Sequence, residues 1–336
     1  MKTSFDPRVT PWEVDERLFE SASTRTGQLE TLVRYAILAP SSHNTQPWRF
    51  GIKEDHIDIF ADRSRWLRVA DPDRRELYLS IGCALENLLV AAEHFGMRHE
   101  TSYLPESSDA DLAATVFLDE EGEPSPFRPP VLFDMIPVRH TNHGPYLHRR
   151  VAPDILRQLH ACNVEEQILL RLLDEERPRQ QIEEMVVRGD AILFANPAFR
   201  NELGYWIGQG VFGTPWLISK IGQFALKHLN VGATQAKRDR AGVMSSPVIG
   251  VISTTEDDRR SQLLAGQVYE RLSLRAAAFG IWTQPLSQII EVPELKQELA
   301  KLIGAPESSP LLAFRLGYGA AETHHKPRRP WHEVMV

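Results

Sequence analysis

The chain has 336 residues, of which 42% are hydrophobic and 25% are charged, so it can bury a sizeable core. Its formal net charge of −7 gives no extended positive field, which argues against nucleic acid or anionic lipid binding by the whole surface. The cysteines Cys83 and Cys162 lie far apart without metal-ligand spacing, so neither a disulfide framework nor a zinc site is indicated.

The first clear pattern is a helix followed by a β-hairpin. Residues 29–37 repeat apolar side chains at i, i+3, i+4, i+7 and i+8, the spacing of one helix face, and Pro40 ends that helix just after Leu38. Two short extended runs follow at residues 48–53 and 56–61, separated by two residues at hairpin spacing. We therefore expect a helix, a loop and two antiparallel strands.

An internal similarity indicates a duplication. Residues 82–96 and 266–280 each run fourteen steps from glycine to glycine, and they share Glu86 with Glu270 and a closing Phe-Gly pair. Chance similarity between two helices rich in Leu and Ala is the alternative. We favour two copies of one unit.

The boundary between the copies is expected at residues 120–130, where acidic residues, glycine and four prolines exclude a packed helix or a central strand. The first repeat then spans residues 1–125 and the second spans 126–336. In the second, residues 151–159 have helical spacing, while 247–253 and 311–316 are apolar runs typical of buried strands. The class is therefore mixed α and β.

The most specific string is APSSHNTQPWRF at residues 39–50. A loop bounded by prolines presents Ser41, Ser42, Asn44 and Gln46 from a rigid backbone, which suits a flat heterocycle edged with donors and acceptors. A turn rich in Ser and Asn that caps its neighbours is the alternative.

This string resembles the A-P-S-x-x-N-x-Q-P-W-x-F signature of nitroreductase-like flavoproteins, and the layout resembles their fused two-repeat Acg-type members. The resemblance implies an α+β nitroreductase-like fold, in which two degenerate repeats form an intramolecular pseudo-dimer with central mixed or antiparallel sheets flanked by helices. It also implies an FMN site whose contacts here are Pro40, Ser41, Ser42, Asn44 and Gln46. The resemblance is firm at residues 39–50 and slight over 160–245.

Members of the family also have a basic string, similar to R-x-S-x-R, that binds the flavin phosphate. The first repeat lacks one, whereas the second supplies Arg139, Thr141 and Asn142 but has no second N-x-Q-P-W string. Each half has what the other lacks. The resemblance therefore implies that both halves contribute to one FMN.

Cations near the C-terminus complete the expected phosphate site. Related proteins end in a Gly-Tyr pair followed by Lys and Arg, and here Lys326, Arg328 and Arg329 follow such a pair. We expect Arg139, Lys326 and Arg328 to clamp the phosphate, because guanidinium groups bind phosphate through two donors and lysine acts as a point charge. A solvated basic tail is the alternative.

Two further features follow from the resemblance and the composition. The loop after the second long helix lies against the flavin ring in the family, which implies contacts from Thr283 and Gln284. Residues 204–216 mix glycines with aromatic side chains, as a lid over the flavin would, so a lid insertion is expected around 190–245. An ordinary loop is the alternative.

The function expected is that of an FMN-dependent oxidoreductase, which passes hydride from NAD(P)H through the flavin to a nitroaromatic, a quinone or a similar acceptor. The cofactor performs the redox step in such chemistry, so no catalytic side chain is predicted. A non-enzymatic protein that sequesters FMN under a lid is the first alternative. A partner-binding module with an inactive site is the second.

Remaining expectations concern metals, partners and location. His140, His143 and His148 lie in a turn-rich segment without other ligands in register, so no metal is expected. Residues 1–20 lack the apolar segment of a secretory signal and no apolar run reaches 18 residues, so we expect a cytoplasmic protein. Its partner is a small-molecule electron acceptor, with neither nucleic acid nor membrane, and it is a monomeric pseudo-dimer or a weak homodimer.

Overall fold

The computed structural model describes residues 10–336, apart from 108, 120–121, 214–221, 224–231 and 321–324. Within these residues, two four-stranded sheets form with the orders β1-β2-β4-β3 and β5-β6-β8-β7. Within each sheet, all neighbouring strands pair antiparallel. When the strands are numbered separately within each sheet, both sheets have the order first, second, fourth, third. This shared topology confirms the α+β class and the two-repeat arrangement.

The first repeat contains the strands β1 (Trp48–Ile52), β2 (His56–Ala61), β3 (Arg98–Tyr103) and β4 (Leu112–Asp119). Its helices are α1 (Arg17–Glu20), α2 (Arg25–Ala36) and α3 (Arg75–His94), with short 3-10 turns at Thr10–Trp12, Ser42–Asn44 and Arg63–Arg65. The expected first helix and hairpin are therefore present as α2, β1 and β2.

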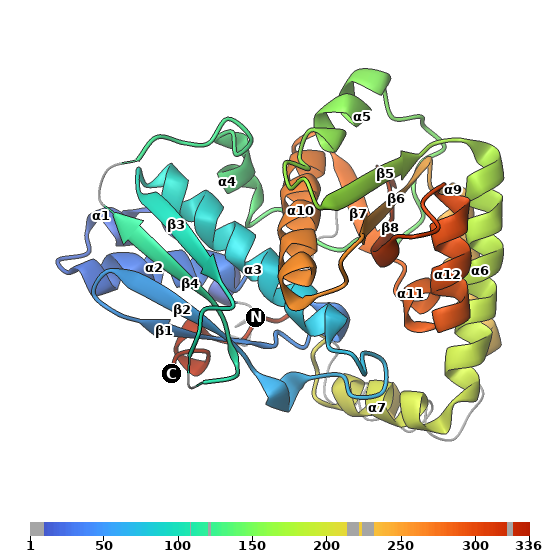
Figure 1. The fold of residues 1–336 in the computed structure, drawn as a ribbon, viewed down its shortest axis with the longest axis horizontal. Helices are drawn as coiled ribbons and strands as arrows, with labels where there is room; N and C mark the ends of the chain where they lie inside the picture. The colour runs from blue at the N-terminus through green and yellow to red at the C-terminus, as the bar shows by residue number, and fades with distance from the viewer. Residues whose placement is uncertain (1–9, 108, 120–121, 214–221, 224–231, 321–324) are drawn as a thin grey trace, which may run out of the picture.

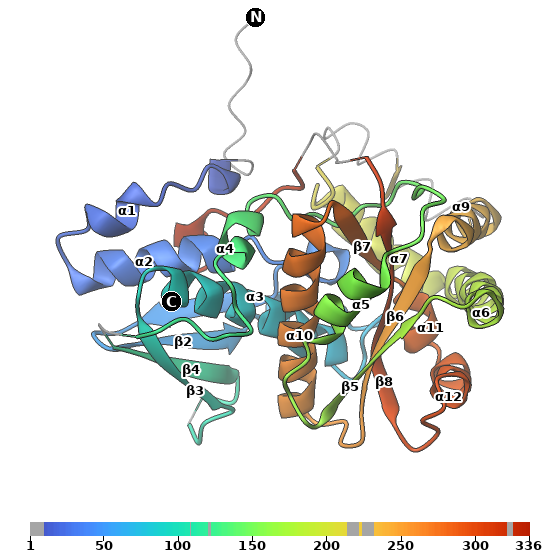
Figure 2. The same ribbon diagram turned by 90° about the horizontal axis from the view of Figure 1, so that it is seen from above.

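The second repeat contains the strands β5 (Ile168–Leu173), β6 (Val248–Thr254), β7 (Ile281–Pro285) and β8 (Ser309–Tyr318). Its helices are α4 (Val131–Met135), α5 (Pro153–His160), α6 (Glu176–Ala195), α7 (Pro197–Gly208), α9 (Gly232–Ser245), α10 (Arg259–Ala278), α11 (Gln288–Glu291) and α12 (Pro293–Leu302), and a 3-10 turn covers Trp331–Glu333. In Figures 1 and 2, α3 and α10 lie between the two sheets.

The helices α3 and α10 cross at equivalent glycines of the two repeats. A Cβ atom on Gly82 would lie 2.0 Å from the carbonyl oxygen of Leu263, and one on Gly266 would lie 2.1 Å from that of Leu79. Only glycine permits so close an approach of two backbones. Because both pairs of residues are equivalent in the aligned repeats, an approximate two-fold axis passes through this crossing.

The end of the chain belongs spatially to the first sheet. The amide of Phe50 donates to the carbonyl of Val334 at 2.8 Å, and the amide of Val336 donates to the carbonyl of Phe50 at 3.0 Å. Met335 thereby pairs with β1 in a parallel bridge. A boundary at residues 125 and 126 stays a prediction, and a cut there would separate β1 from this C-terminal partner.

The segment expected as a lid is largely helical where the structure describes it, and its role as a lid stays a prediction. Asn196 caps α7 by accepting from the amide of Ala198, and Pro197 occupies the first turn, so the helix continues through Gly204 and ends at Gly208. Trp206 packs with Phe199 in a separate apolar cluster. Residues 214–216 of the expected lid lie outside the described residues.

Candidate functional site

The loop after α2 has an unusual backbone. His43, Asn44 and Gln46 have φ angles of 48°, 53° and 53°, which are left-handed values that side chains disfavour. Ser41 stabilises the turn because its Oγ accepts from the amide of Gln46 at 2.9 Å. Such strain persists where the surrounding structure enforces it, and it concentrates at functional sites. The loop is therefore a candidate for ligand binding.

Distant parts of the chain hold this loop through Asn44. Its Nδ2 donates to the carbonyl oxygens of Val211, at 2.6 Å, and Pro327, at 2.9 Å. Its Oδ1 accepts from Nη1 of Arg328 at 2.9 Å. The loop thus contacts both the segment after α7 and the C-terminal tail.

Two arginines meet behind this loop. Nη2 of Arg139 and Nη2 of Arg328 both donate to the carbonyl oxygen of Leu38, at 3.3 Å and 3.0 Å. Both side chains are buried, and Nε of Arg139 lies 3.1 Å from Oε1 of Glu270. Among the described residues, Nη1 of Arg139 and Nε of Arg328 find no hydrogen-bond acceptor. Buried donors without a partner are costly, so an added anion would stabilise them.

The electrostatics agree with a surplus of positive charge at this point. Burial raises the pKa of Glu270 to about 7, although the charges of Arg139 and Arg328 act in the opposite direction. Burial also lowers the pKa of Arg328 to about 9, and the neighbouring Arg139 lowers it further. Two buried cations thus face one carboxyl group that is only partly ionised near neutral pH.

A cavity of about 260 Å³ lies beside these arginines, between the two repeats. This volume is close to the lower end of the usual range for small-molecule sites, about 300–1,000 Å³. Eight of the site residues predicted from sequence line it together: Pro40, Ser41, Ser42, Asn44, Arg139, Thr141, Lys326 and Arg328. Asn44 from the first repeat and Arg139 from the second therefore meet at one cavity.

The other predicted residues, Gln46, Asn142, Thr283, Gln284 and Arg329, are not among the residues that line this cavity. Oε1 of Gln46 accepts from the amide of Arg329 at 2.7 Å, which fixes the tail against the loop. Nδ2 of Asn142 donates to the carbonyl of Ala320 at 2.7 Å. Contact between a ligand and these side chains stays a prediction.

Thr283 and Gln284 lie on β7 and also have protein partners. Oγ1 of Thr283 lies 3.2 Å from the hydroxyl of Tyr269, and Oε1 of Gln284 accepts from Nε of Arg315 at 2.6 Å. Tyr269 itself lines the cavity. Thr283 therefore reaches the site through a residue that sequence reasoning missed.

Sequence reasoning also missed one face of α3. Glu76, Ser80 and Cys83 line the cavity at the spacing i, i+4 and i+7, which places them on the same side of a helix. Oγ of Ser80 accepts a hydrogen bond from the amide of Ser42 at 3.3 Å. This bond links α3 to the signature loop, residues 39–50. The available signal was a run of polar residues along one face of an otherwise apolar helix.

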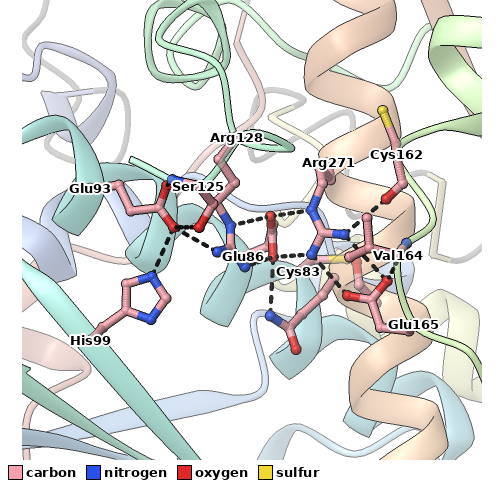
Figure 3. A network of polar contacts seen from close by, with 12 residues as sticks. Cys83, Glu86, Glu93, His99, Ser125, Arg128, Cys162, Val164, Glu165 and Arg271 are labelled. Carbon is pink, nitrogen blue, oxygen red and sulfur yellow. Dashed lines mark hydrogen bonds and ion pairs between the residues drawn. The ribbon is translucent and has the colours of Figure 1, made fainter. Parts of the chain in front are cut away.

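A second buried charged group, Glu86, lies at the position equivalent to Glu270. Figure 3 shows Arg128 and Arg271 on either side of it. Nε and Nη2 of Arg128 donate to its two oxygens at 2.8 Å and 3.1 Å, and those of Arg271 donate at 2.7 Å and 2.9 Å. Arg128 and Arg271 also pair with Glu93 and Glu165, respectively. Here the protein supplies its own counter-charges.

The two-repeat α+β fold, the loop at residues 39–50 and the cavity shared by both repeats resemble the nitroreductase-like class of proteins. No protein-family model matches the chain. Over 324 residues it is 28% identical to the "Putative NAD(P)H nitroreductase acg" of Mycobacterium tuberculosis, an alignment that covers 92% of this chain and 96% of the relative. The similarity over most of both chains confirms the resemblance predicted from the sequence.

Two further similarities were found. A second "Putative NAD(P)H nitroreductase" of M. tuberculosis is 24% identical over 317 residues, covering 91% of this chain and 89% of the relative. The solved FMN-dependent nitroreductase NfnB from Mycobacterium smegmatis, in complex with NADPH, has a TM-score of 0.42 and 14% identity, covering 60% of this chain and 96% of that chain. In the described residues, no helix has the length and apolarity needed to cross a membrane.

Proposed function

We propose that this chain is an FMN-dependent oxidoreductase that takes hydride from NAD(P)H and passes electrons to a small acceptor such as a nitroaromatic or a quinone. The observation that carries the proposal is the buried pair Arg139 and Arg328, which has unpaired donors beside a cavity between the repeats. The relatives named as NAD(P)H nitroreductases support the choice of reductant and reaction class.

The arginine pair fits the phosphate of FMN. Nη1 of Arg139 and Nε of Arg328 are buried donors without acceptors among the described residues, and Lys326 also lines the cavity. Charge-assisted hydrogen bonds from guanidinium groups to phosphate are short and strong. Glu270 offsets only part of the positive charge. These residues would therefore hold the anionic end of the cofactor.

The rest of the cavity fits a flat ring with a polar edge. Ser41 and Ser42 present short polar groups from the strained loop, whereas Leu79, Pro285 and Leu312 supply apolar walls. When bound, FMN supplies the redox chemistry, because its ring accepts and releases hydride. The protein side chains bind and orient that ring and exclude water from it.

Both repeats contribute to the cavity, which supports a site built within one chain. The signature loop and α3 come from the first repeat, and Tyr269, Pro285 and Leu312 come from the second. In a homodimer of separate subunits, such contacts would come from two chains. We propose that the monomer is competent to bind FMN, as expected of an intramolecular pseudo-dimer.

The visible spectrum of the purified protein, before and after NADPH, tests this function. We expect bound flavin absorbance that bleaches rapidly when NADPH is added without oxygen and recovers when a quinone or a nitroaromatic follows. Flavin that bleaches with dithionite but not with NADPH or NADH would contradict the oxidoreductase and indicate FMN storage. Protein that stays colourless after incubation with FMN would contradict the cofactor itself.

A further inference from the structure

One buried acceptor in the cavity has no role in the site as described so far. Glu76 is only 3% exposed and lines the cavity, and its Oε1 accepts from Nη2 of Arg75 at 2.9 Å. Its other oxygen, Oε2, has no hydrogen-bond partner among the residues that the structure describes. A buried carboxylate oxygen without a donor is unfavourable, so this atom indicates a donor group on the ligand.

Glu76 is separated from the arginine pair along the part of the cavity wall that α3 forms. Along α3, Glu76 precedes Cys83 by seven residues, or about 10 Å at the helical rise of 1.5 Å per residue. Cys83 lies within electrostatic reach of Arg139 and Glu270, which mark the anion-binding end. A ligand that satisfies both ends must be elongated, with an anion at one end and an N–H or O–H donor at the other.

The protein holds Glu76 firmly in place. Nη1 of Arg75 donates to the carbonyl of Leu311 at 2.5 Å while Nη2 pairs with Glu76. The amide of Glu76 donates to Oδ1 of Asp71 at 2.9 Å. A carboxylate oriented in this way offers a preorganised acceptor, and it loses little conformational entropy when a ligand binds.

A neighbouring carboxyl group, Glu291, differs from Glu76 in two respects. It is not among the residues that line the cavity. Burial raises its pKa well above the ordinary value, and the negative charge of Glu76 acts in the same direction. Glu76, by contrast, lines the cavity and forms an ion pair with Arg75. Glu291 provides a matched control, since glutamine mimics its protonated form.

We infer that Oε2 of Glu76 accepts the imide N–H of the flavin ring, a contact that rests on the proposed binding of FMN. In FMN this N–H is a ring donor at the end of the molecule away from the phosphate, which matches the separation of Glu76 from Arg139 and Arg328. The negative charge beside the ring also disfavours electron uptake. Glu76 therefore fixes the orientation of the ring and lowers the reduction potential of the flavin.

Binding of FMN and of its N3-methyl derivative tests the contact, because the methyl group removes the donor. We expect the wild-type protein to bind N3-methyl FMN at least about tenfold more weakly than FMN, as befits loss of a charge-assisted hydrogen bond. Glu76→Ala should bind the two flavins with affinities within about threefold of each other. Glu291→Gln should keep the wild-type discrimination. Discrimination that is equal in the wild type and in Glu76→Ala would overturn the inference.

The reduction potential of the bound flavin gives a second readout that is independent of turnover. Glu76→Gln keeps the shape of the side chain but removes its charge, so the midpoint potential of bound FMN should rise, whereas Glu291→Gln should leave it near the wild-type value. An unchanged potential in Glu76→Gln would contradict the assigned contact. If the wild-type protein bound neither flavin, the proposed FMN site itself would be wrong.

Discussion

The approximate two-fold symmetry relates Glu86 on α3 to Glu270 on α10. The two residues have the same position in their helices but different surroundings. Both carboxyl groups are fully buried. Glu86 receives paired hydrogen bonds from Arg128 and Arg271 (Figure 3). Among the described residues, Glu270 forms one ion pair, with Arg139, and its neighbour Tyr269 lines the cavity. Both oxygens of Glu86 are therefore bound by the protein, whereas Oε2 of Glu270 has no hydrogen-bond partner among the described residues.

The difference changes the ionisation of the two groups. Burial would raise the pKa of Glu86, but Arg128 and Arg271 outweigh it and hold that pKa well below its ordinary value. Burial raises the pKa of Glu270 to about 7, because Arg139 and Arg328 compensate only in part. The charges around Glu86 are satisfied within the protein, whereas Arg139 and Arg328 beside Glu270 keep donors without an acceptor among the described residues.

One substitution between the repeats accounts for much of this contrast. The residue after Glu86 is Asn87, and the equivalent residue after Glu270 is Arg271. Arg271 crosses the interface to Glu86, while Asn87, with its amide nitrogen turned toward Glu270, donates to it at 3.0 Å. The long cation closes one site. The short amide leaves room at the other.

Glu86→Gln should have the largest effect on folding. Removing the carboxylate leaves Arg128 and Arg271 with too little compensating charge in the core, which typically costs about 3–5 kcal/mol. Urea denaturation of the protein without flavin measures this loss. Glu270→Gln is the matched control, and its effect should be much smaller because neutral Gln avoids burying a charge. Equal losses in the two variants would contradict the proposed difference between the sites.

The contributions of Glu86 and Glu270 to stability should depend on pH in opposite directions. The pKa of Glu86 is lower in the folded protein than in the unfolded chain, where it is about 4.3. Its ionised carboxylate therefore stabilises the fold above about pH 4.3, and this stabilisation is lost as the pH falls toward the folded pKa. The pKa of Glu270 is raised to about 7 in the folded protein. Its contribution to the free energy of unfolding is therefore fully present below about pH 4.3, the unfolded pKa, and is lost as the pH rises to about 7. Glu86→Gln should flatten the acid limb, and Glu270→Gln should flatten the slope between those values.

Arg139→Ala and Arg328→Ala should have the next largest effect, and the property they change should be ligand affinity. Each substitution removes charge-assisted bonds to the phosphate, so FMN affinity should weaken by about 1.5–3 kcal/mol, measured by quenching of flavin fluorescence. Riboflavin, which lacks the phosphate, should bind both variants nearly as well as it binds the wild type. Arg25→Ala is the control, since Arg25 donates to Leu118 away from the cavity. Unchanged FMN affinity in both variants would remove the phosphate clamp.

Local patterns made the fold predictable. The loop at residues 39–50 and the helices at 82–96 and 266–280 have signals that lie within short stretches, and they correspond to the loop after α2 and to parts of α3 and α10. Arg139 and Arg328 were found through the resemblance, and the structure brings them together. The helical form of residues 204–208 had no signal in their own glycine-rich composition, because the cap at Asn196 and Pro197, eight residues earlier, starts the helix that continues through them. The role of this stretch as a lid stays a prediction.

The role of Glu76 and Glu270 could not be read from the sequence. Each looks like an ordinary helical residue, because glutamate is common on exposed helix faces. What distinguishes them is burial at a crossing between segments that are about 180 residues apart, as Gly82 and Gly266 show. The cavity wall at Phe212 likewise comes from a segment that barely resembles the family. Such tertiary contacts have no local signal.

Glu270→Gln should have the smallest effect on FMN affinity. Whether the affinity rises or falls distinguishes an anion site from a structural ion pair. In the wild type, Glu270 loses its proton as the pH rises through about 7, so positive charge at Arg139 and Arg328 is increasingly offset and FMN binding should weaken. The FMN phosphate ionises near pH 6, below this window. Between pH 7 and 8 the wild-type affinity should fall by at most about tenfold.

The variant should bind FMN more tightly than the wild type at pH 8 and show little change between pH 7 and 8. Binding of riboflavin should be nearly independent of the substitution, because riboflavin brings no anion to the arginine pair. A pH slope that persisted in Glu270→Gln would assign the titration to another group. Weaker FMN binding by the variant at both pH values would mean that Glu270 chiefly positions Arg139, so that the carboxylate serves the site by orientation and not by adjusting its charge.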